Sequence, residues 1–456
     1  MKRRKFLQHT VAGIPGMLLL PAWLGSCKKN SLFTDVSYNG KVVIVGAGIS
    51  GLYAAHLLRS VGAQVEILEA SGAVGGRIRP LHDFADFTIE LGAEEIHGDR
   101  SAWFDLLQQQ GAAIAAPENS DLYYFNNSLQ TEAEASLNGQ YNLIAQLLSS
   151  LQEYSGSDMN AEQFAQSKNV NDNVMHIWNA WVGNEYGTNN ARIGIKGIAD
   201  TEMAWTSGDT NYTLRSGDFL DIIHSYFKEE IQSVQFNKQV VNVVSESGKI
   251  SLSTSDGDLF SADKVILTVP HAVLASGSIA FEPALPSSKI QAFDKIGMDR
   301  GLKIILRFSH AFWPPGTGSI YGPGAVPEFW VTRGARTGQD AVLTGFVNGE
   351  SAEYLAGLGD QMINEVMAEL DLLFGDASSF LQDVYIQDWG AEEFIGGAYS
   401  YPKPGSFGAR EILAAPLDDR LYFAGEATHT GGHYGTVHGA METAMRAVTQ
   451  LLERVS

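Results

Sequence analysis

Cysteine and basic residues are scarce in this 456-residue chain. Cys27 is the only cysteine, which excludes an intramolecular disulfide. The body of the chain therefore has no cysteine-based metal site, no cysteine nucleophile and no thiol that could tether a cofactor. Lys and Arg number 31 against 52 Asp and Glu, for a net charge of −21. Such a surface repels nucleic acid and anionic lipid and would attract protonated amines, although solubility alone also explains it. We expect neither a nucleic-acid partner nor a bound metal ion.

Long apolar runs are also missing, apart from one near the N-terminus. Residues 2–5 are basic, and residues 11–24 are apolar but interrupted by glycine and proline. This run is too short and too broken for a good membrane span, and it predicts a signal peptide over residues 1–27. The pair Arg3-Arg4 before Phe6-Leu7 resembles a twin-arginine signal, which would export a protein already folded around a cofactor. An ordinary secretory signal with a chance arginine pair is the alternative.

The end of the predicted signal, Leu24-Gly25-Ser26-Cys27, resembles a bacterial lipobox. In that interpretation Cys27 is lipidated and becomes the mature N-terminus, and the polar residues 28–37 form a tether. We therefore expect an exported protein of the periplasm or cell envelope, whose only attachment to the membrane is a lipid on Cys27.

The body of the chain opens with a strand, a glycine-rich turn and a helix. Residues 41–45 form an apolar run that is typical of a buried parallel strand, and Gly46-Ala47-Gly48-Ile49-Ser50-Gly51 follows directly. A helical pattern comes next, and then a second strand over residues 64–68, which ends at Glu69. Glu69 can accept hydrogen bonds from ribose hydroxyls, so the whole unit predicts a dinucleotide site.

Each small residue of the turn has a physical role in that prediction. Gly46 allows the sharp turn from strand to helix, and Gly48 lets backbone N–H groups approach a pyrophosphate. Gly51 lets the helix pack against the strand, and Ser50 lies beside it in the first turn. The N-terminus of the helix holds the anion.

Gly75-Gly76-Arg77 follows Glu69 after a short loop, and here the chain resembles the flavin amine oxidase family. This family includes the monoamine oxidases, the polyamine oxidases and the lysine-specific histone demethylases. Its pattern is an acid, a short loop and Gly-Gly-Arg beside the phosphates of FAD, so the resemblance assigns Gly76 and Arg77 to the cofactor. Family members usually have Arg two residues after the acid. Ser71 stands there in this chain, so Arg77 would carry more of the phosphate charge.

The resemblance covers nearly the whole chain and implies further contacts with FAD. Residues 91–98 resemble the segment that passes the flavin ring in polyamine oxidases, and 421–428 resemble a strand whose acid bonds the hydroxyls of the flavin side chain. The last helix opens within residues 435–440, and its N-terminus points at the flavin pyrimidine. Val240 matches a residue near the adenine, and a plain core valine is compatible with that place. The residues assigned to FAD in these segments are Ala93, Glu94, Glu95, Val240, Gly425, Glu426, Thr436 and Val437.

The resemblance also implies catalytic roles for Lys303, Trp389, Tyr399 and His97. Lys303 lies in a run of Ile and Leu, where burying a charge is costly without a partner, and its family counterpart holds a water against flavin N5. A solvated edge-strand lysine is the alternative. Trp389 matches an aromatic residue near that water. His97 matches a substrate-side histidine of animal polyamine oxidases, or is a hydrogen-bonded structural histidine.

An aromatic cage that guides the amine is the last feature that the resemblance implies. Tyr399 matches one wall of the cage, since an aromatic face attracts cations. Monoamine oxidases have their second cage tyrosine where Thr436 stands, so we expect a half-open cage that suits longer amines, unless Tyr434 fills the gap. Monoamine oxidases tether the flavin through a cysteine at the position of Ala398. Alanine cannot form that bond, so we expect FAD to be bound non-covalently.

The expected fold class is α/β, with an FAD-binding Rossmann-like domain of the GR2 type and a discontinuous α+β substrate domain. We assign residues 38–100, 232–280 and 384–456 to the FAD-binding domain, and residues 101–231 and 281–383 to the substrate-binding domain. The first substrate segment is mostly helical in pattern, with loops expected near residues 117–127 and 183–190. The second mixes strands with a helix over residues 360–373.

The resemblance implies FAD-dependent oxidation of the C–N bond of an amine to an imine, with reoxidation by O₂ to give H₂O₂. A polyamine substrate is favoured, because Glu94, Glu95 and His97 lie near the expected site and the acids suit a polycation. One alternative is an L-amino-acid oxidase or tryptophan 2-monooxygenase type of enzyme, which would need an arginine for the substrate carboxylate. The other is a non-catalytic FAD-binding protein, and Lys303, Trp389 and Tyr399 speak against it.

The lipobox interpretation predicts that Cys27→Ser releases the protein from the membrane fraction, because the serine hydroxyl cannot become the lipidated N-terminus. Fractionation of cells that express the wild type and the variant, followed by detection of the protein, measures this. Equal membrane association of the two would remove the anchor.

Overall fold

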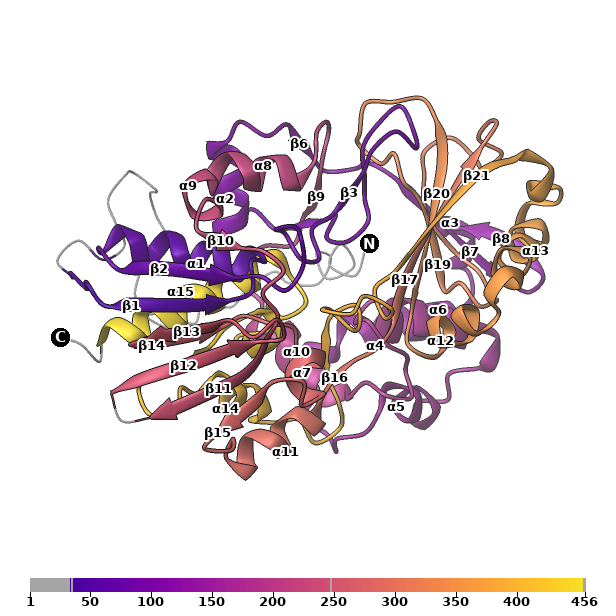
Figure 1. Cartoon of the computed structure of the whole chain (residues 1–456). Coiled ribbons are helices and arrows are strands. Elements are labelled where there is room, and N and C mark those ends of the chain that lie inside the picture. The colour runs from indigo at the N-terminus through magenta and orange to yellow at the C-terminus, as the bar shows by residue number, and fades with distance from the viewer. Residues whose placement is uncertain (1–32, 34–35, 247, 454–456) are drawn as a thin grey trace.

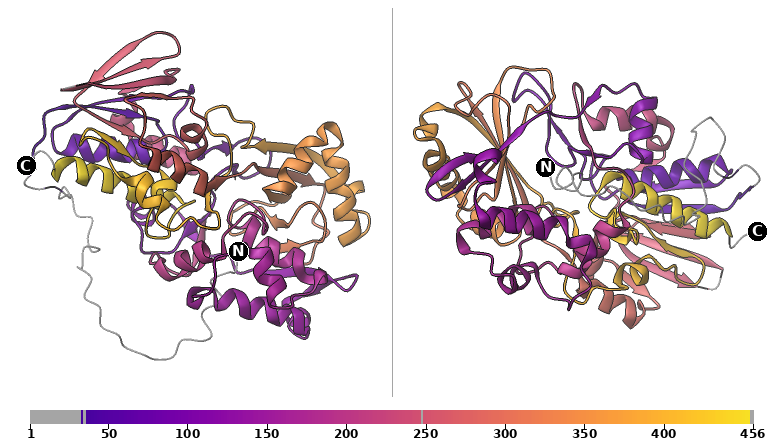
Figure 2. Two further views of the ribbon diagram at one scale, coloured as in Figure 1. Left: turned by 90° about the horizontal axis from the view of Figure 1, so that it is seen from below. Right: turned by 180° about the vertical axis from the view of Figure 1, so that it is seen from behind.

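The computed structural model describes residues 33, 36–246 and 248–453, which fold into two lobes (Figure 1). Figure 2 shows the same two lobes from below and from behind. The predicted signal peptide, Cys27 and most of the predicted tether lie outside the described residues. Within the described ranges, no helix combines the length and the apolar character that crossing a bilayer requires.

A five-stranded parallel sheet forms the centre of the first lobe, in the order β10-β2-β1-β14-β23. Its strands are β1 (Lys41–Val45), β2 (Gln64–Leu68), β10 (Val234–Gln235), β14 (Lys264–Leu267) and β23 (Leu421–Phe423). The first two occupy the residues that the sequence predicts. The sheet joins segments from three distant parts of the chain, and it places their carboxyl ends at one edge.

Both faces of this sheet are buried, which explains why its strands are continuously apolar. Val42 and Ile44 pack against α1 (Ile49–Ser60) and α15 (Val437–Glu453), while Val43 and Val45 pack toward a four-stranded sheet. That second sheet has the order β13-β12-β11-β15. Its strands are β11 (Val240–Glu246), β12 (Lys249–Thr254), β13 (Leu259–Ala262) and β15 (Ala280–Glu282).

A seven-stranded sheet dominates the second lobe, in the order β21-β17-β20-β19-β18-β7-β8. Its strands are β7 (Ser120–Phe125), β8 (Ser128–Thr131), β17 (Gly301–Phe308), β18 (Thr317–Tyr321), β19 (Glu328–Val331), β20 (Ala341–Asn348) and β21 (Leu381–Asp388). The helices α12 (Glu350–Gly357) and α13 (Met362–Phe374), orange in Figure 1, cover one face. Leu302 and Ile304 point into that core, so the intervening Lys303 points to the opposite face, because successive side chains of a strand alternate.

Helices pack beneath this sheet and around the first lobe. Tyr141, Trp178 and Ile198 belong to a core formed by α4 (Gly139–Ser149), α6 (Asp172–Asn179) and α7 (Ile195–Ala204). The other α-helices are α2 (Ala102–Gln109), α3 (Glu132–Ala135), α5 (Ala161–Ser167), α8 (Phe219–Tyr226), α9 (Lys228–Ile231), α10 (His271–Ala275), α11 (Ser287–Lys295) and α14 (Ala409–Ala414). The short strands are β3 (Pro80–Leu81), β4 (Ile89–Glu90), β5 (Ile96–His97), β6 (Ile114–Ala115), β9 (Asn211–Leu214), β16 (Ile296–Met298) and β22 (Ser400–Pro402).

Two details of the predicted organisation differ from the structure. The loop expected near residues 117–127 is wrong, since β7 and β8 form a hairpin there. Asn126 and Asn127 both have positive φ, of 52° and 60°, as the tight turn of a two-residue hairpin requires. The expected domain boundaries at 280/281 and 383/384 fall inside β15 and β21, so the sheets divide the chain a few residues away from them.

Candidate active site

One cavity of about 780 Å³ extends from the glycine-rich turn after β1 to the inner face of the seven-stranded sheet. Every residue that the sequence assigns to the cofactor or to catalysis lines this cavity, with the exception of Gly51. The fold therefore gathers side chains from at least six separate stretches of the chain around one space.

The three glycines of the turn meet different constraints. Gly46 has φ +108°, and a Cβ there would lie 2.7 Å from Thr268 Oγ1. A Cβ on Gly51 would lie 2.0 Å from the carbonyl oxygen of Gly46, so this glycine serves the packing of helix on strand. A Cβ on Gly48 would meet nothing within 4 Å, because this backbone faces open space.

The start of α1 offers hydrogen-bond donors to that space. Gly48 provides no side-chain cap, and the first turn carries no acidic side chain. The first N–H groups of a helix have no intrahelical partners and attract anions. The Ser50 hydroxyl is buried and has no partner among the described residues. These features fit a phosphate.

Glu69 is held in place at the end of β2. Its Oε2 accepts the N–H of Ala47 at 2.7 Å, and its Oε1 accepts the N–H and the hydroxyl of Ser71 at 2.9 and 2.7 Å. Ser71, which stands where the family usually has Arg, therefore orients the acid. Each carboxylate oxygen has two lone pairs, so Oε2 can also accept a ribose hydroxyl.

The guanidinium of Arg77, the expected phosphate ligand, lines the cavity and is oriented by Glu426 and by a backbone carbonyl. Its Nη1 donates to the carbonyl of Ala398 at 2.8 Å and to Glu426 Oε1 at 3.1 Å. Glu426 also accepts the hydroxyl of Ser400 at 2.7 Å and the N–H of Gly435 at 2.8 Å. Burial alone would raise the pKa of Glu426, but the charges of Arg77 and Arg410 outweigh it and lower this pKa.

The segment that the sequence places beside the flavin ring is tightly held. The N–H of Ala93 donates to the carbonyl of Arg77 at 3.1 Å, and a Cβ on Gly92 would lie 1.8 Å from that same oxygen. Trp389 donates its indole N–H to the carbonyl of Leu91 at 3.0 Å. The backbone between Leu91 and Ala93 therefore has little freedom to move.

Lys303 is buried, at 4% exposure, and is ion-paired. Its Nζ donates to Glu94 Oε2 and to the carbonyl of Glu90, both at 2.8 Å. Arg336 donates to Glu94 Oε1 at 3.0 Å. Burial would raise the pKa of Glu94, but the charges of Lys303 and Arg336 outweigh it and lower this pKa.

Two expectations change as a result. The alternative that Lys303 is a solvated edge-strand lysine is wrong, since β17 pairs with β20 on one side and β21 on the other. Glu94 was expected to receive part of a polycation, but its two oxygens are already bonded to Lys303 and Arg336. The sequence shows no partner for the buried ammonium of Lys303, and the structure supplies one in Glu94.

Tyr399 stands on the wall of the cavity with its ring fixed in orientation. Its hydroxyl donates to the carbonyl of Glu185 at 2.7 Å. A Cβ on either Gly187 or Gly435 would lie 2.9 Å from a ring carbon, so two glycines let the backbone approach the ring closely. Burial, followed by the charges of nearby carboxylates, raises the pKa of Tyr399 well above its usual range, so the phenol stays protonated.

Tyr434 also lines the cavity, and its hydroxyl lies 2.5 Å from Thr201 Oγ1. The guanidinium of Arg410 stacks 3.7 Å from the centre of its ring. Thr436, whose size predicts a half-open cage, accepts the N–H of Gly439 at 2.9 Å and so caps the first turn of α15. The threonine thus stabilises the helix, and Tyr434 supplies a second aromatic wall.

Three carboxylates line the same cavity: Glu95, Glu185 and Glu328. Glu95 Oε2 accepts the amide of Asn211 at 2.9 Å, while its Oε1 is buried without a partner among the described residues. Burial, followed by the negative charges of Glu185, Glu94 and Glu328, raises the pKa of Glu95 to about 8. Burial also raises the pKa of Glu328.

His97 lies beside this group, with Nδ1 3.3 Å from Asn211 Oδ1 and 3.8 Å from Glu95 Oε2. His97 is hydrogen-bonded and lines the cavity, a position that is compatible with both interpretations of this histidine. Val240 likewise is 4% exposed and lines the cavity.

Sequence reasoning did not single out Glu185, Glu328 or Arg336. Glu185 lies in the stretch 183–190 that is expected as a loop, and it directly follows the π-helical turn Ala180–Asn184. Glu328 had a usable signal, since it stands in an apolar strand just as Lys303 does. Arg336 follows β19 and had none, because its partner Glu94 is 242 residues away.

Comparison with known proteins is consistent with this geometry. Residues 219–452 match the profile of the family described as flavin containing amine oxidoreductase, and residues 44–109 match an NAD(P)-binding Rossmann-like domain. Polyamine oxidase 3 of Oryza sativa subsp. japonica is 25% identical over 448 residues, which is 92% of this chain and 90% of that protein. Lysine-specific histone demethylase 1 homolog 2 of the same organism is 27% identical over 90% of this chain, but the chain spans only 57% of that protein.

Solved structures share the fold. A putrescine oxidase bound to putrescine superposes with a TM-score of 0.80 and 20% identity, covering 92% of this chain and all of the other. Cyclohexylamine oxidase from Brevibacterium oxydans has a TM-score of 0.78 and 19% identity, with the same coverage.

The two glycines Gly48 and Gly51 give a matched test of the cofactor site. Gly48→Ala should fold normally and bind FAD roughly tenfold more weakly, about 1.4 kcal/mol, because the methyl group enters the space beside the helix N-terminus. Gly51→Ala should lower the free energy of unfolding by about 3 kcal/mol or more, because its methyl group overlaps the carbonyl of Gly46. Thermal unfolding and FAD titration of both purified variants measure this. Equal FAD affinity in Gly48→Ala and the wild type would contradict the assignment.

Proposed function

Because the chain belongs to the family of flavin-containing amine oxidoreductases, we propose that it is an FAD-dependent amine oxidase that converts the C–N bond of a polyamine-like substrate to an imine. The observation that carries the proposal is the single cavity that joins the glycine-rich turn to the aromatic walls Tyr399 and Tyr434. The predicted family and the predicted α/β class with a Rossmann-like domain are both confirmed by the matches.

The residues present fit FAD. The N-terminus of α1 and the Ser50 hydroxyl offer donors for the pyrophosphate, and Glu69 offers an acceptor for a ribose. Ala398, which lines the cavity, has no group that could bond to the ring, so the cofactor is held without a covalent link. When bound, FAD supplies the acceptor for the hydride equivalent, and O₂ takes up the electrons as H₂O₂.

The chain itself orients the amine and keeps the site dry. Tyr399 and Tyr434 present ring surfaces to the cavity, which direct an amine between them. A protonated amine cannot release a hydride readily, so its nitrogen has to lose a proton in the site. Glu95, which is bonded to Asn211 and lies near His97, belongs to the acids that would bind a second ammonium of the substrate. Lys303 donates its ammonium N–H groups to Glu94 Oε2 and to the backbone carbonyl of Glu90.

A polyamine suits the charges of the cavity. Burial first, and then the charges of Glu185, Glu94 and Glu328, raises the pKa of Glu95, so a cationic group beside these acids would favour their charged forms. An aliphatic chain with a second ammonium can place one nitrogen at the tyrosines and the other at the acids. The printed names of the polyamine oxidase and putrescine oxidase relatives agree with this chemistry.

Two alternatives have less support. An amino-acid oxidase needs an arginine for the substrate carboxylate, but Arg77 and Arg79, which line the cavity, are each paired with a carboxylate of the protein. A non-catalytic FAD-binding protein would have no use for a buried Lys303 held by an ion pair beside an aromatic-lined cavity. Export, and the lipid on Cys27, remain proposals that rest on the N-terminal sequence alone.

Anaerobic mixing of the purified protein with spermidine, tyramine and L-tryptophan in parallel tests the substrate class. Spermidine should bleach the flavin absorbance at the lowest concentration. Glu95→Gln should raise the KM for spermidine by roughly 10- to 100-fold, the effect of about 1.5–3 kcal/mol for one lost charged contact, and should change the KM for tyramine less. The exposed Glu118→Gln is the control. Bleaching by L-tryptophan alone would instead identify an amino-acid oxidase, and no bleaching by any of the three would remove the enzyme proposal.

Lys303→Met should slow oxygen consumption on the order of 10²-fold while FAD content stays normal, because a positioned charge beside the reacting atoms is lost. Glu94 keeps the cation of Arg336 as its partner in this variant, so the loss of the ammonium leaves no buried carboxylate unpaired. Lys249→Met, at an exposed position at the start of β12, is the control. Wild-type rates in Lys303→Met would refute the role of the ammonium.

A further inference from the structure

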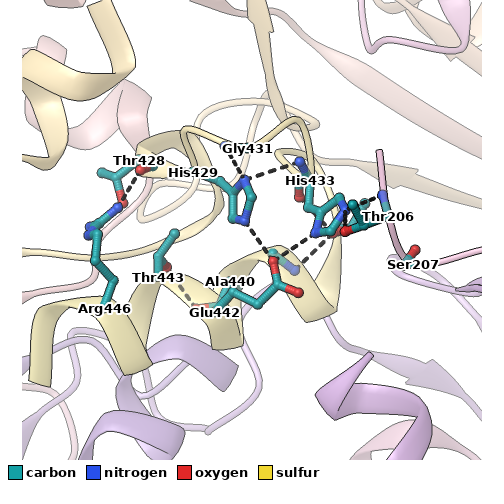
Figure 3. Close-up of polar contacts among 12 residues, drawn as sticks. Thr206, Ser207, Thr428, His429, Gly431, His433, Ala440, Glu442, Thr443 and Arg446 are labelled. Carbon is teal, nitrogen blue, oxygen red and sulfur yellow. Dashed lines mark hydrogen bonds and ion pairs between the residues drawn. The ribbon is translucent and has the colours of Figure 1, made fainter. Parts of the chain in front are cut away.

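A group of titratable side chains outside the cavity is not used by the mechanism above. Glu442 lies on the second turn of α15, and His429 and His433 lie in the loop that precedes this helix (Figure 3). Glu442 Oε2 is 2.6 Å from His429 Nε2 and 2.7 Å from His433 Nδ1. None of the three lines the cavity. We call Glu442, His429 and His433 the histidine–glutamate brace.

Each ring of the brace has a defined tautomer. His429 Nδ1 accepts the backbone N–H groups of Gly431 and His433 at 3.0 and 3.1 Å, and His433 Nε2 accepts the N–H of Thr206 at 3.2 Å. A backbone N–H can only donate, so these ring nitrogens carry no proton. The opposite nitrogen of each ring then donates its N–H to Glu442. Both histidines are therefore neutral in this arrangement.

The same hydrogen bonds disfavour a metal ion, although two histidines and a carboxylate lie within 4.8 Å of one another. A histidine that binds a metal through one nitrogen carries its proton on the other and donates it to an acceptor. His429 Nδ1 faces two N–H donors, so it cannot carry that proton without breaking both bonds. The hydrogen-bond pattern is that of a carboxylate with two donors.

The brace joins three parts of the chain that each carry residues lining the cavity. Through His433 and Thr206, Glu442 links α15 to the segment that follows α7. The loop lies close to α7, because a Cβ on Gly432 would be 2.8 Å from the carbonyl of Thr201. Other contacts of α15 with this loop use different residues, such as Arg446 with Thr428 (Figure 3).

His433 and its partner Thr206 each stand next in the chain to an aromatic residue that lines the cavity. His433 directly precedes Tyr434, whose ring forms one wall. Thr206 directly follows Trp205, which lines the cavity and whose ring centre lies 4.8 Å from that of His433 and 6.1 Å from that of His97. One carboxylate oxygen therefore holds the two segments that carry Tyr434 and Trp205.

A second proton on either ring would break this arrangement. A proton on His433 Nε2 would face the N–H of Thr206, and a proton on His429 Nδ1 would face two N–H groups, so donor would oppose donor. Burial first, with the charges of His433 and Arg410, lowers the pKa of His429 despite Glu442. A histidine whose pKa is lowered on folding stabilises the fold above its unfolded pKa, about 6.5, and loses that contribution as the pH falls.

The other charged or titratable groups near the brace have contacts of their own or stay neutral, so they do not replace its histidines as the groups that gain a proton. His438 on α15 is 1% exposed, and burial holds its pKa well below the usual range, so it stays neutral. His97 at the end of β5 lies beyond His438, at 6.3 Å between ring centres. Arg410 on α14 is bonded to Ser400 and stacked on Tyr434. Arg446 on α15 donates to the carbonyl and the hydroxyl of Thr428.

We propose that Glu442 is a positioning residue for amine oxidation, and that its two neutral histidines release Tyr434 and Trp205 from the walls of the amine site when they are protonated at acid pH. This inference rests on the proposed function, because Tyr434 and Trp205 line the cavity that the proposed amine would enter. It adds a pH-dependent control of amine binding from residues that never touch the substrate.

Kinetics of the full-length holoenzyme between pH 5 and pH 8 test the proposal, with spermidine as the amine. Glu442→Leu removes the acceptor of both N–H groups and should raise KM about tenfold at pH 7.5, with kcat changed less. Glu442→Gln can keep its carbonyl oxygen at the place of Oε2 but lacks the charge that favours a second proton on the rings. Its loss of amine binding should therefore occur roughly one pH unit lower than in the wild type. Glu453→Gln, exposed on the last turn of the same helix, is the matched control and should follow the wild type.

A spectroscopic measurement keeps this test separate from the proposed function. ¹⁵N NMR of histidine-labelled protein should show one ring with a proton on Nδ1 only and another with a proton on Nε2 only at pH 7.5, both lost in Glu442→Leu. These signals do not depend on turnover, so they show whether both histidines donate to Glu442 even if no amine bleaches the flavin. Doubly protonated rings at pH 7.5, an unchanged KM in Glu442→Leu, or stoichiometric Zn²⁺ binding that Glu442→Gln abolishes would overturn the proposal.

Discussion

Glu426 is a buried carboxylate on which the cavity depends, because it bonds to three parts of the chain at once. It accepts hydrogen bonds from Arg77, from Ser400 and from the backbone of Gly435, and Arg77 is 349 residues away in sequence. Removing one partner from a buried charged group costs about 3–5 kcal/mol, so each of these contacts constrains the other two. This one side chain therefore holds Arg77, the strand β22 and the start of α15 next to one another.

The charges around the cavity are arranged in two groups with different degrees of pairing. Near the expected flavin ring, Lys303 and Arg336 share the carboxylate of Glu94, so the buried ammonium has an anionic partner inside the protein. On the amine side, Glu95 lies among other acids and has a raised pKa. A cationic substrate would pair with the second group, whereas the cations and the carboxylate of the first already pair with each other.

Residues outside the cavity set the positions of those inside it. The backbone of Gly187 and Gly435 packs closely against the ring of Tyr399, with no room for a side chain at either position. The guanidinium of Arg410 stacks on the ring of Tyr434. The histidine–glutamate brace acts in the same way on the segments of Tyr434 and Trp205, with hydrogen bonds instead of packing. Packing does not respond to pH, but a hydrogen bond that requires a neutral histidine does, so the two kinds of support differ in what can weaken them.

The sequence by itself determined the features whose partners are close along the chain. The strand, glycine-rich turn, helix and acid of the dinucleotide unit lie within 30 residues of one another, and β1, β2 and the roles of Gly48 and Gly51 followed from their order and spacing. Lys303 stood out because a charge in an apolar strand needs a partner. Which partner it has, and that Glu94 is thereby withdrawn from the substrate, depended on a contact 209 residues apart in sequence. Glu185, Glu328, Arg336 and the brace were decided only by the tertiary structure, because their side chains acquire a function from neighbours that spacing along the chain does not reveal.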